Sequence, residues 1–148
     1  MIAGRQPWMP APDYGRSIKP GLGVNLLVKD VQAAIRFATQ ALGATETYSD
    51  DGFGVLRFAG SEWMVHADHT FHSNPLRGVI AGIEARGAGV ELRLYGCDPD
   101  QAEQAARRGG WTILAGSIDK PHGLRECMII DDDGYVWVPG VPLPNEAG

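Results

Sequence analysis

The strongest constraint on the fold is an order of elements that occurs twice along the chain. In the first half, the apolar segment 24–28 is followed by Asp30, by apolar residues at helical spacing over 31–42, and by Gly43. A β-branched apolar run predicts a strand, and an Asp caps a helix start by accepting orphan backbone N–H groups. A Gly fits the position after a helix end. Three strand candidates then complete a βαβββ unit, at 45–49, 53–58 and 62–67.

The same order returns in the second half. Residues 90–95 form a strand candidate, and Asp98 followed by Pro99 predicts a helix start, because Pro fits the first helical position. The pair Gly109-Gly110 ends this helix. Three strand candidates follow at 111–115, 124–130 and 135–138, the last of them after the turn sequence Asp132-Asp133-Gly134.

Two such units cannot bury the inner faces of their sheets alone, so they must pack together. We therefore predict an α+β fold of two βαβββ modules with a cleft between the halves. Trp8 in the N-terminal arm is expected to dock that arm on the body or on a partner subunit. The predicted boundaries are an irregular N-terminal arm at 1–21, a first module at 22–68, a connector at 69–89, a second module at 90–140 and a C-terminal tail at 141–148.

Composition narrows the class of protein. The 148 residues carry a formal net charge of −5 and no basic cluster, so we expect no nucleic-acid partner. No apolar run approaches the roughly 20 residues that cross a bilayer, and the N-terminus lacks the apolar core of a signal peptide. We therefore expect a cytoplasmic protein that has no membrane partner. Cys97 and Cys127 follow no zinc-ligand spacing and are expected to be small buried residues.

Residues at both ends of the repeat resemble the vicinal-oxygen-chelate superfamily, which includes glyoxalases, bleomycin-resistance proteins and extradiol dioxygenases. Residues 23–30, with Phe37 and Leu42-Gly43, resemble its "L-x-V-x-D, helix, F, L-G" opening. Residues 123–126 and 131–137 resemble its "G-x-R-E … D-P-D-G" close, with Asp132 where the family usually has Pro. The resemblance implies a cupped eight-stranded mixed sheet with helices on the outer face, a ligand site in the concavity, and a homodimer.

The resemblance also implies where a metal would bind. Metal-using members place ligands on the first and last strands of each module, and the matching positions here are Gly23, His66, Glu91 and Val138. Gly and Val supply no donor atom, so at most two of four ligands remain, whereas divalent sites usually need three or more. We therefore expect no metal and no cofactor. The alternative is one divalent metal ion that uses His66 and Glu91.

Polar residues alternate with Leu on the first strand of the second module. Glu91, Arg93 and Tyr95 share one face of this strand, because a strand has a side-chain period of two. Helices cover the other face in this fold, so we expect the polar face to line the cleft. A solvated face, or a structural pairing of Arg93 with Glu126, is the alternative. The predicted ligand-binding residues are Asn25, His66, Glu91, Arg93, Tyr95, Glu126 and Met128.

Some side chains keep two interpretations. His66, His69 and His72 recur every third residue, which does not place them on one face of a strand. This spacing favours one cleft or core histidine and two loop histidines over a metal or proton-transfer cluster. Tyr95, Trp63 and Trp137 provide either aromatic surface for a planar ligand or core.

The predicted function is metal-independent binding of a small molecule in the cleft. The sequence has no nucleophile elbow, P-loop or dinucleotide fingerprint. One rival is a metal-dependent lyase, isomerase or dioxygenase that uses His66 and Glu91 to polarise vicinal oxygens. Another is an acid–base enzyme in which Glu91 or Glu126 abstracts a proton.

Overall fold

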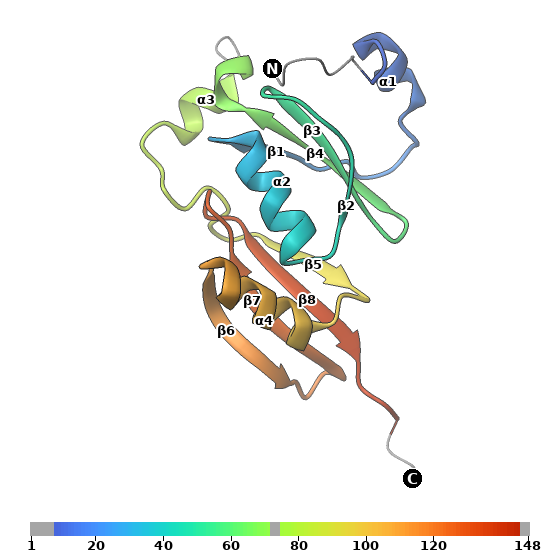
Figure 1. Cartoon of the computed structure of the whole chain (residues 1–148), viewed down its shortest axis with the longest axis vertical. Helices are drawn as coiled ribbons and strands as arrows, with labels where there is room; N and C mark the ends of the chain where they lie inside the picture. The colour runs from blue at the N-terminus through green and yellow to red at the C-terminus, as the bar shows by residue number, and fades with distance from the viewer. Residues whose placement is uncertain (1–7, 72–74, 146–148) are drawn as a thin grey trace.

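The computed structural model describes residues 8–71 and 75–145. Two copies of the predicted βαβββ order follow one another, separated by a connector and preceded by a short helix (Figure 1). The elements are α1 (Ala11–Ser17), β1 (Asn25–Val28), α2 (Val31–Gln40), β2 (Thr45–Ser49), β3 (Phe53–Phe58), β4 (Ser61–Ala67), the 3₁₀ helix η1 (Asp68–Phe71), α3 (Pro75–Ile80), β5 (Glu91–Tyr95), α4 (Pro99–Gly109), β6 (Thr112–Asp119), β7 (Leu124–Ile130) and β8 (Val136–Pro142).

Each module contributes one mixed sheet. The strand orders are β1-β4-β3-β2 and β5-β8-β7-β6. In both sheets the first and last strands of the module pair in parallel and the remaining pairs are antiparallel. The predicted α+β fold of two βαβββ modules is confirmed, with the eight strands divided between two four-stranded sheets. Figure 1 shows α2 and α4 on the same side of these sheets.

Both long helices begin at the predicted Asp residues. The Asp30 carboxylate accepts a hydrogen bond from the backbone N–H of Ala33 at 3.2 Å. The Asp98 carboxylate accepts one from Asp100 at 2.9 Å. These bonds satisfy N–H groups that have no partner inside the helix. At the end of α4, Gly110 adopts the left-handed conformation that follows many helix ends.

A hydrophobic core joins the modules on the helix side. The Phe37 ring of α2 lies 5.3 Å from that of Trp111 and 6.2 Å from that of Trp137, measured between centroids. Trp63 of the first sheet lies 5.2 Å from Trp137 of the second, and both are buried. These two rings therefore belong to the core, and the interpretation of them as a surface for a planar ligand is wrong.

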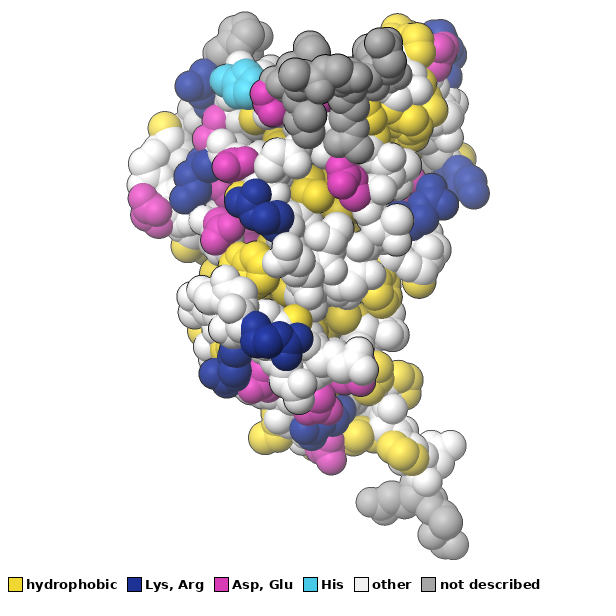
Figure 2. All heavy atoms as spheres, in the orientation of Figure 1, with side chains coloured by type: hydrophobic (Ala, Val, Ile, Leu, Met, Phe, Trp, Pro, Cys, Tyr) yellow, Lys and Arg dark blue, Asp and Glu magenta, His cyan; other side chains and the backbone are white. Residues whose placement is uncertain are grey.

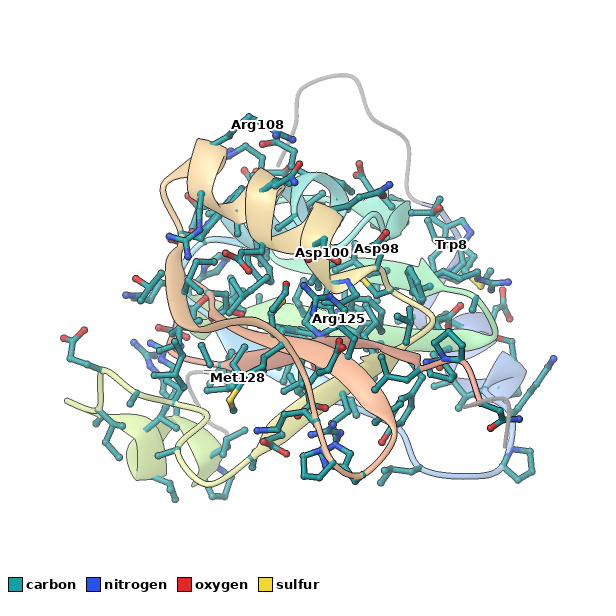
Figure 3. The ribbon with its side chains drawn as sticks, turned by 90° about the horizontal axis from the view of Figure 1, so that it is seen from below. Trp8, Asp98, Asp100, Arg108, Arg125 and Met128 are labelled. Atoms are coloured by element: carbon teal, nitrogen blue, oxygen red, sulfur yellow. The ribbon has the colours of Figure 1, made fainter. Side chains whose placement is uncertain are left out.

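The other face of each sheet, turned away from α2 and α4, is called the open face below. Gly54 of β3 points toward α2, because a Cβ there would lie 3.1 Å from the Ile35 side chain. Its neighbours Phe53 and Val55 consequently point to the open face. On the second sheet, Met128 lies on the side opposite α4 (Figure 3).

The structure differs from the sequence-based expectations at the N-terminal arm and in the connector. The arm, expected to be irregular, contains α1, which has Pro10 at its N-cap and no capping side chain. The connector contains a short helix, α3, at Pro75–Ile80. Strand β8 continues through Pro139 and Gly140, two residue types that usually end a strand. Within the described residues, no helix is long and apolar enough to cross a membrane.

Candidate functional site

The guanidinium of Arg93 gathers three of the other predicted site residues on the open face of the second sheet. It donates to the Glu91 carboxylate at 3.0 Å and to the Tyr95 hydroxyl at 3.2 Å. It also forms an ion pair with Glu126 of β7. The pairing of Arg93 with Glu126, left open by the sequence, is therefore present, together with contacts to Glu91 and Tyr95.

Strand register explains how Arg93 reaches Glu126 across β8. In the β5–β8 ladder Arg93 pairs with Val138 and Tyr95 pairs with Gly140. In the β8–β7 ladder Gly140 pairs with Glu126. Because Gly140 carries no side chain, nothing stands between β5 and β7 at this level of the open face.

Burial is uneven within the group. The Glu126 side chain is 10% exposed, that of Arg93 25% and that of Glu91 47%. Burial alone lowers the pKa of Arg93, but hydrogen bonds to Tyr95, Glu91 and Glu126 raise it by more, so the guanidinium stays charged. The His122 ring lies 3.5 Å from the Glu126 carboxylate.

Apolar and aromatic surface surrounds these charges. Met128 is half-buried, and Val138, which pairs with Arg93, is 1% exposed and shares its face. Tyr95 is 60% exposed, so its ring presents a flat surface to solvent beside the guanidinium. The arrangement can hold a flat group against Tyr95 and accept hydrogen bonds at Glu91.

The predicted residues of the first module form a separate pair. Asn25 of β1 and His66 of β4 lie on adjacent parallel strands, with the Asn25 amide oxygen 2.6 Å from His66 Nδ1. An amide oxygen only accepts, so this contact places the proton on Nδ1. Burial lowers the pKa of His66, partly offset by the negative charge of Asp50, which favours the neutral ring.

The structure places two members of the histidine series on different elements. His66 is half-buried on β4, and its ring lies 4.8 Å from that of Phe53. His69 is exposed on η1. His72 lies outside the described residues.

The donor atoms of the described residues do not fit the family's metal site. Gly23 and Val138 offer no ligand atom, and Glu91 is engaged by Arg93. Among residues 8–71 and 75–145, no three His, Cys, Asp or Glu side chains are grouped so that they could hold a metal ion.

The closing motif provides structural contacts. Arg125 of β7 forms an ion pair with Asp100 of α4 at 2.9 Å and another with Asp119 of β6 at 2.9 Å. Figure 3 shows Arg125 beneath the start of α4, near Asp98 and Asp100. We therefore assign Arg125 to fastening the helix onto its sheet.

Sequence reasoning missed an aromatic group on the first sheet. Trp8 docks on the body of its own chain, with its ring 5.9 Å from Tyr48 and 5.0 Å from Tyr14. The Tyr14 hydroxyl donates to Glu62 at 3.1 Å. Burial and the negative charge of Glu62 raise the pKa of Tyr14 to about 12. No periodic pattern in the arm indicates this placement; Trp8 was the one available signal.

A cavity of about 470 Å³ lies on the helix side, between the end of α2 and α4. Two of its polar lining residues have structural partners: Asp98 caps α4, and the Cys97 thiol donates to the backbone oxygen of Leu42 at 3.3 Å. Figure 2 shows this side of the molecule, where acidic and basic side chains are intermixed without a patch of one sign. The open face is therefore the better candidate.

The two thiols are expected to be unreactive in the folded protein. Burial raises the pKa of Cys97 to about 12 and that of Cys127 to about 11. Because the thiolate is the nucleophile, neither should react with a disulfide reagent such as DTNB at pH 8. Both should react once urea unfolds the chain. Rapid labelling of either thiol in the native protein would contradict this expectation and reopen cysteine chemistry.

Solved structures share the fold over most of the chain. A glyoxalase/bleomycin resistance protein/dioxygenase from Nocardioides matches with a TM-score of 0.61 and 21% identity, covering 92% of this chain and 91% of that one. The vicinal-oxygen-chelate resemblance is thereby confirmed at the level of the fold. The chain has the vicinal-oxygen-chelate fold. No family model and no curated protein matches its sequence.

Two further solved structures also share the fold. A glyoxalase/bleomycin resistance protein/dioxygenase family enzyme from Burkholderia phytofirmans PsJN matches with a TM-score of 0.65 and 18% identity, over 81% of this chain and 96% of that one. TioX from Micromonospora sp. ML1 matches with a TM-score of 0.59 and 19% identity, over 86% of this chain and 100% of that one. At these identities the likeness is one of fold, and the choice between binder and enzyme depends on the site.

Proposed function

We propose that this protein binds a small molecule, without a metal, on the open face of its second sheet. The observation that carries the proposal is the placement of Arg93. Its guanidinium is held by Glu91, Tyr95 and Glu126 on the face turned away from α2 and α4, beside the apolar side chain of Val138. Polar groups that converge on an apolar and aromatic surface are typical of small-molecule sites.

The exposed parts of this group indicate the chemistry of the ligand. Tyr95 offers a ring face, and the half-exposed Glu91 carboxylate accepts hydrogen bonds. Arg93 and Glu126 are more deeply placed and fix the geometry of the other two side chains. The site therefore suits a ligand with a flat ring and an adjacent N–H or O–H donor.

Metal independence is supported by how the candidate ligands are engaged. In the second module Glu91 binds Arg93, and in the first module His66 Nδ1 contacts Asn25. The equivalents of two further family ligands are Gly23 and Val138. The rival metal-dependent enzyme would need His66 and Glu91 to be supplemented by donors that these positions lack.

The test uses the exposed members of the group, because their loss leaves the Arg93–Glu126 pair intact. We expect Tyr95→Leu and Glu91→Gln to weaken binding of the best compound from a thermal-shift panel of aromatic amines and aromatic carboxylates by at least about 5-fold. The loss of one stacking or hydrogen-bond contact has this size. Both variants should keep the free energy of unfolding within about 1 kcal/mol. Arg107→Met on α4 is the matched control and should bind as the parent does.

Two results would contradict the proposal. One is unchanged affinity in both Tyr95→Leu and Glu91→Gln. The other is a stoichiometric metal in protein purified without chelators that is lost in His66→Ala, which would favour the metal-dependent enzyme.

A further inference from the structure

Four aromatic side chains and a histidine form a continuous surface group on the first sheet. The rings of Trp8 and Tyr48 are stacked, 22° apart in plane and 5.9 Å between centroids. Tyr14 meets Phe53 edge-on at 5.8 Å, and Phe53 lies 4.8 Å from His66. All five rings are only partly buried, so the group lies at the surface of the molecule.

Register places this group on the open face. Phe53 pairs with His66, and Tyr48 pairs with Val55. Paired residues on neighbouring strands point to the same face, and Gly54 between Phe53 and Val55 points to α2. The aromatic group therefore lies on the same face of its sheet as the predicted site residues Asn25 and His66.

The segment that brings Trp8 and Tyr14 to this face is weakly held. Between positions 10 and 23, Tyr14 is the one residue that is not exposed. Leu22 is 97% exposed, and Gly21 has φ of +132° with nothing within 4 Å of a Cβ built on it. A segment with so few buried contacts opens at low free-energy cost.

We propose that residues 8–17 form a lid, and that its Trp8 ring on Tyr48 and its Tyr14 ring against Phe53 occupy the place where a planar aromatic ligand stacks. This inference rests on the proposed function, because it assumes that the open face receives a small molecule. It adds a stacking surface for the flat ring of that ligand on the first sheet, and an internal competitor for this surface. The exposed segment 18–23 is the hinge of this lid.

Replacing the Trp8 ring by a ligand ring changes the stacking free energy little. A ligand ring that replaces the Trp8 indole gives Tyr48 a new stacking partner of the same kind, so the gain and the loss are similar in size. The apparent affinity is reduced by the fraction of time that the lid is closed. Any change that loosens the lid without altering Tyr48 or Phe53 must then tighten binding.

Proflavine, a planar and fluorescent tricyclic compound, is a suitable probe. We expect Trp8→Ala to bind it about 3- to 10-fold more tightly than the parent, the range expected from losing one aromatic pair. Tyr14→Phe keeps the ring but removes the bond to Glu62, and should tighten binding by about 2- to 5-fold. Phe53→Leu should weaken it at least 5-fold. Leu22→Ala, in the adjoining segment at a residue that is 97% exposed, should leave it unchanged.

Hydrogen exchange supplies the second readout. Saturating proflavine should speed exchange of the amides of α1, because the displaced lid loses its contacts. Weaker or unchanged binding in Trp8→Ala, or unchanged exchange in α1, would overturn the lid. If proflavine binds no variant while Tyr95→Leu still weakens another compound, the lid fails and the proposed function stands. If Tyr95→Leu and Glu91→Gln leave binding of every compound unchanged while Trp8→Ala tightens proflavine binding, the proposed site on the second sheet fails and the lid stands.

Discussion

Replacing Arg86 by methionine is expected to lower the free energy of unfolding by about 3–5 kcal/mol, the usual cost of breaking a buried ion pair. Its side chain is 9% exposed and donates to both oxygens of Asp68, at 2.7 and 2.8 Å. It also donates to the backbone oxygen of Leu27 at 3.1 Å and lies 3.9 Å from Asp133. Arg86 thus joins β1 and η1 of the first module to the turn before β8 of the second.

The carboxylates around Arg86 explain the size of the loss. Burial raises the pKa of Asp133, and the nearby guanidinium is among the charges that lower it again. Asp133 is 3% exposed, so its charge loses a compensating neighbour when Arg86 is replaced. Asp133 keeps its hydrogen bond from the backbone N–H of Lys29 at 2.9 Å, which does not replace a positive charge.

The effect should depend on pH in a defined direction. The hydrogen bond from Arg86 lowers the pKa of Asp68. A carboxyl with a lowered folded-state pKa stabilises the fold above its unfolded value of about 3.9, and this contribution is lost as pH falls through the lower folded pKa. The difference in free energy of unfolding between the parent and Arg86→Met should therefore be largest at pH 7 and should shrink below about pH 4.

Urea unfolding at pH 7 measures the loss, with Arg107→Met as the matched control. Arg107 pairs with Glu103 but its side chain is 60% exposed, so its replacement should cost no more than about 1 kcal/mol. Adding Asp133→Asn to Arg86→Met should recover part of the stability, because it removes the uncompensated charge. A loss below about 1 kcal/mol in Arg86→Met would show that this contact does not hold the modules together.

Local signals in the sequence were sufficient for the architecture. Asp30 and Asp98 mark helix starts because a cap involves only residues two or three positions away. The alternation of Glu91, Arg93 and Tyr95 predicts a shared face because that depends only on the period of a strand. Both predictions needed no knowledge of how distant segments pack.

Features that depend on distant segments could not be predicted in the same way. The sequence left the pairing of Arg93 with Glu126 as an alternative, because the contact depends on β8 lying between β5 and β7 and on Gly140 on β8 between them. Alternation assigns Trp137 to a face but does not say which face the helices cover. Arg86 lies in the connector, where no period indicates burial.

The aromatic lid shows the same limit. Tyr14 belongs to a segment with no hydrophobic period, and its partners Phe53 and Glu62 are on β3 and β4. Its position becomes meaningful only when the arm is seen to cross the open face of the first sheet.

Replacing Gly134 by alanine should also cost about 3–5 kcal/mol, through the backbone of the same junction. Gly134 has φ of +86°, and a Cβ there would lie 2.6 Å from both the Ala85 Cα and the Glu84 backbone oxygen. The left-handed conformation alone costs about 1–2 kcal/mol for a residue with a Cβ. The rest comes from the clash, because the opposing backbone is fixed by hydrogen bonds from Arg86 N to Asp133 O at 3.2 Å and from Gly87 N to Gly134 O at 3.3 Å.

Gly123 separates the two contributions. It has φ of +91°, but nothing lies within 4 Å of a Cβ built on it, so Gly123→Ala should cost only the conformational part, about 1–2 kcal/mol. Because Gly134 and Arg86 act on one junction, the loss in Gly134→Ala combined with Arg86→Met should be smaller than the two single losses added together. Equal losses in Gly134→Ala and Gly123→Ala would mean that the connector moves away freely. The two modules would then be joined by their shared core around Phe37 and Trp137, and the Arg86 junction would be a secondary contact.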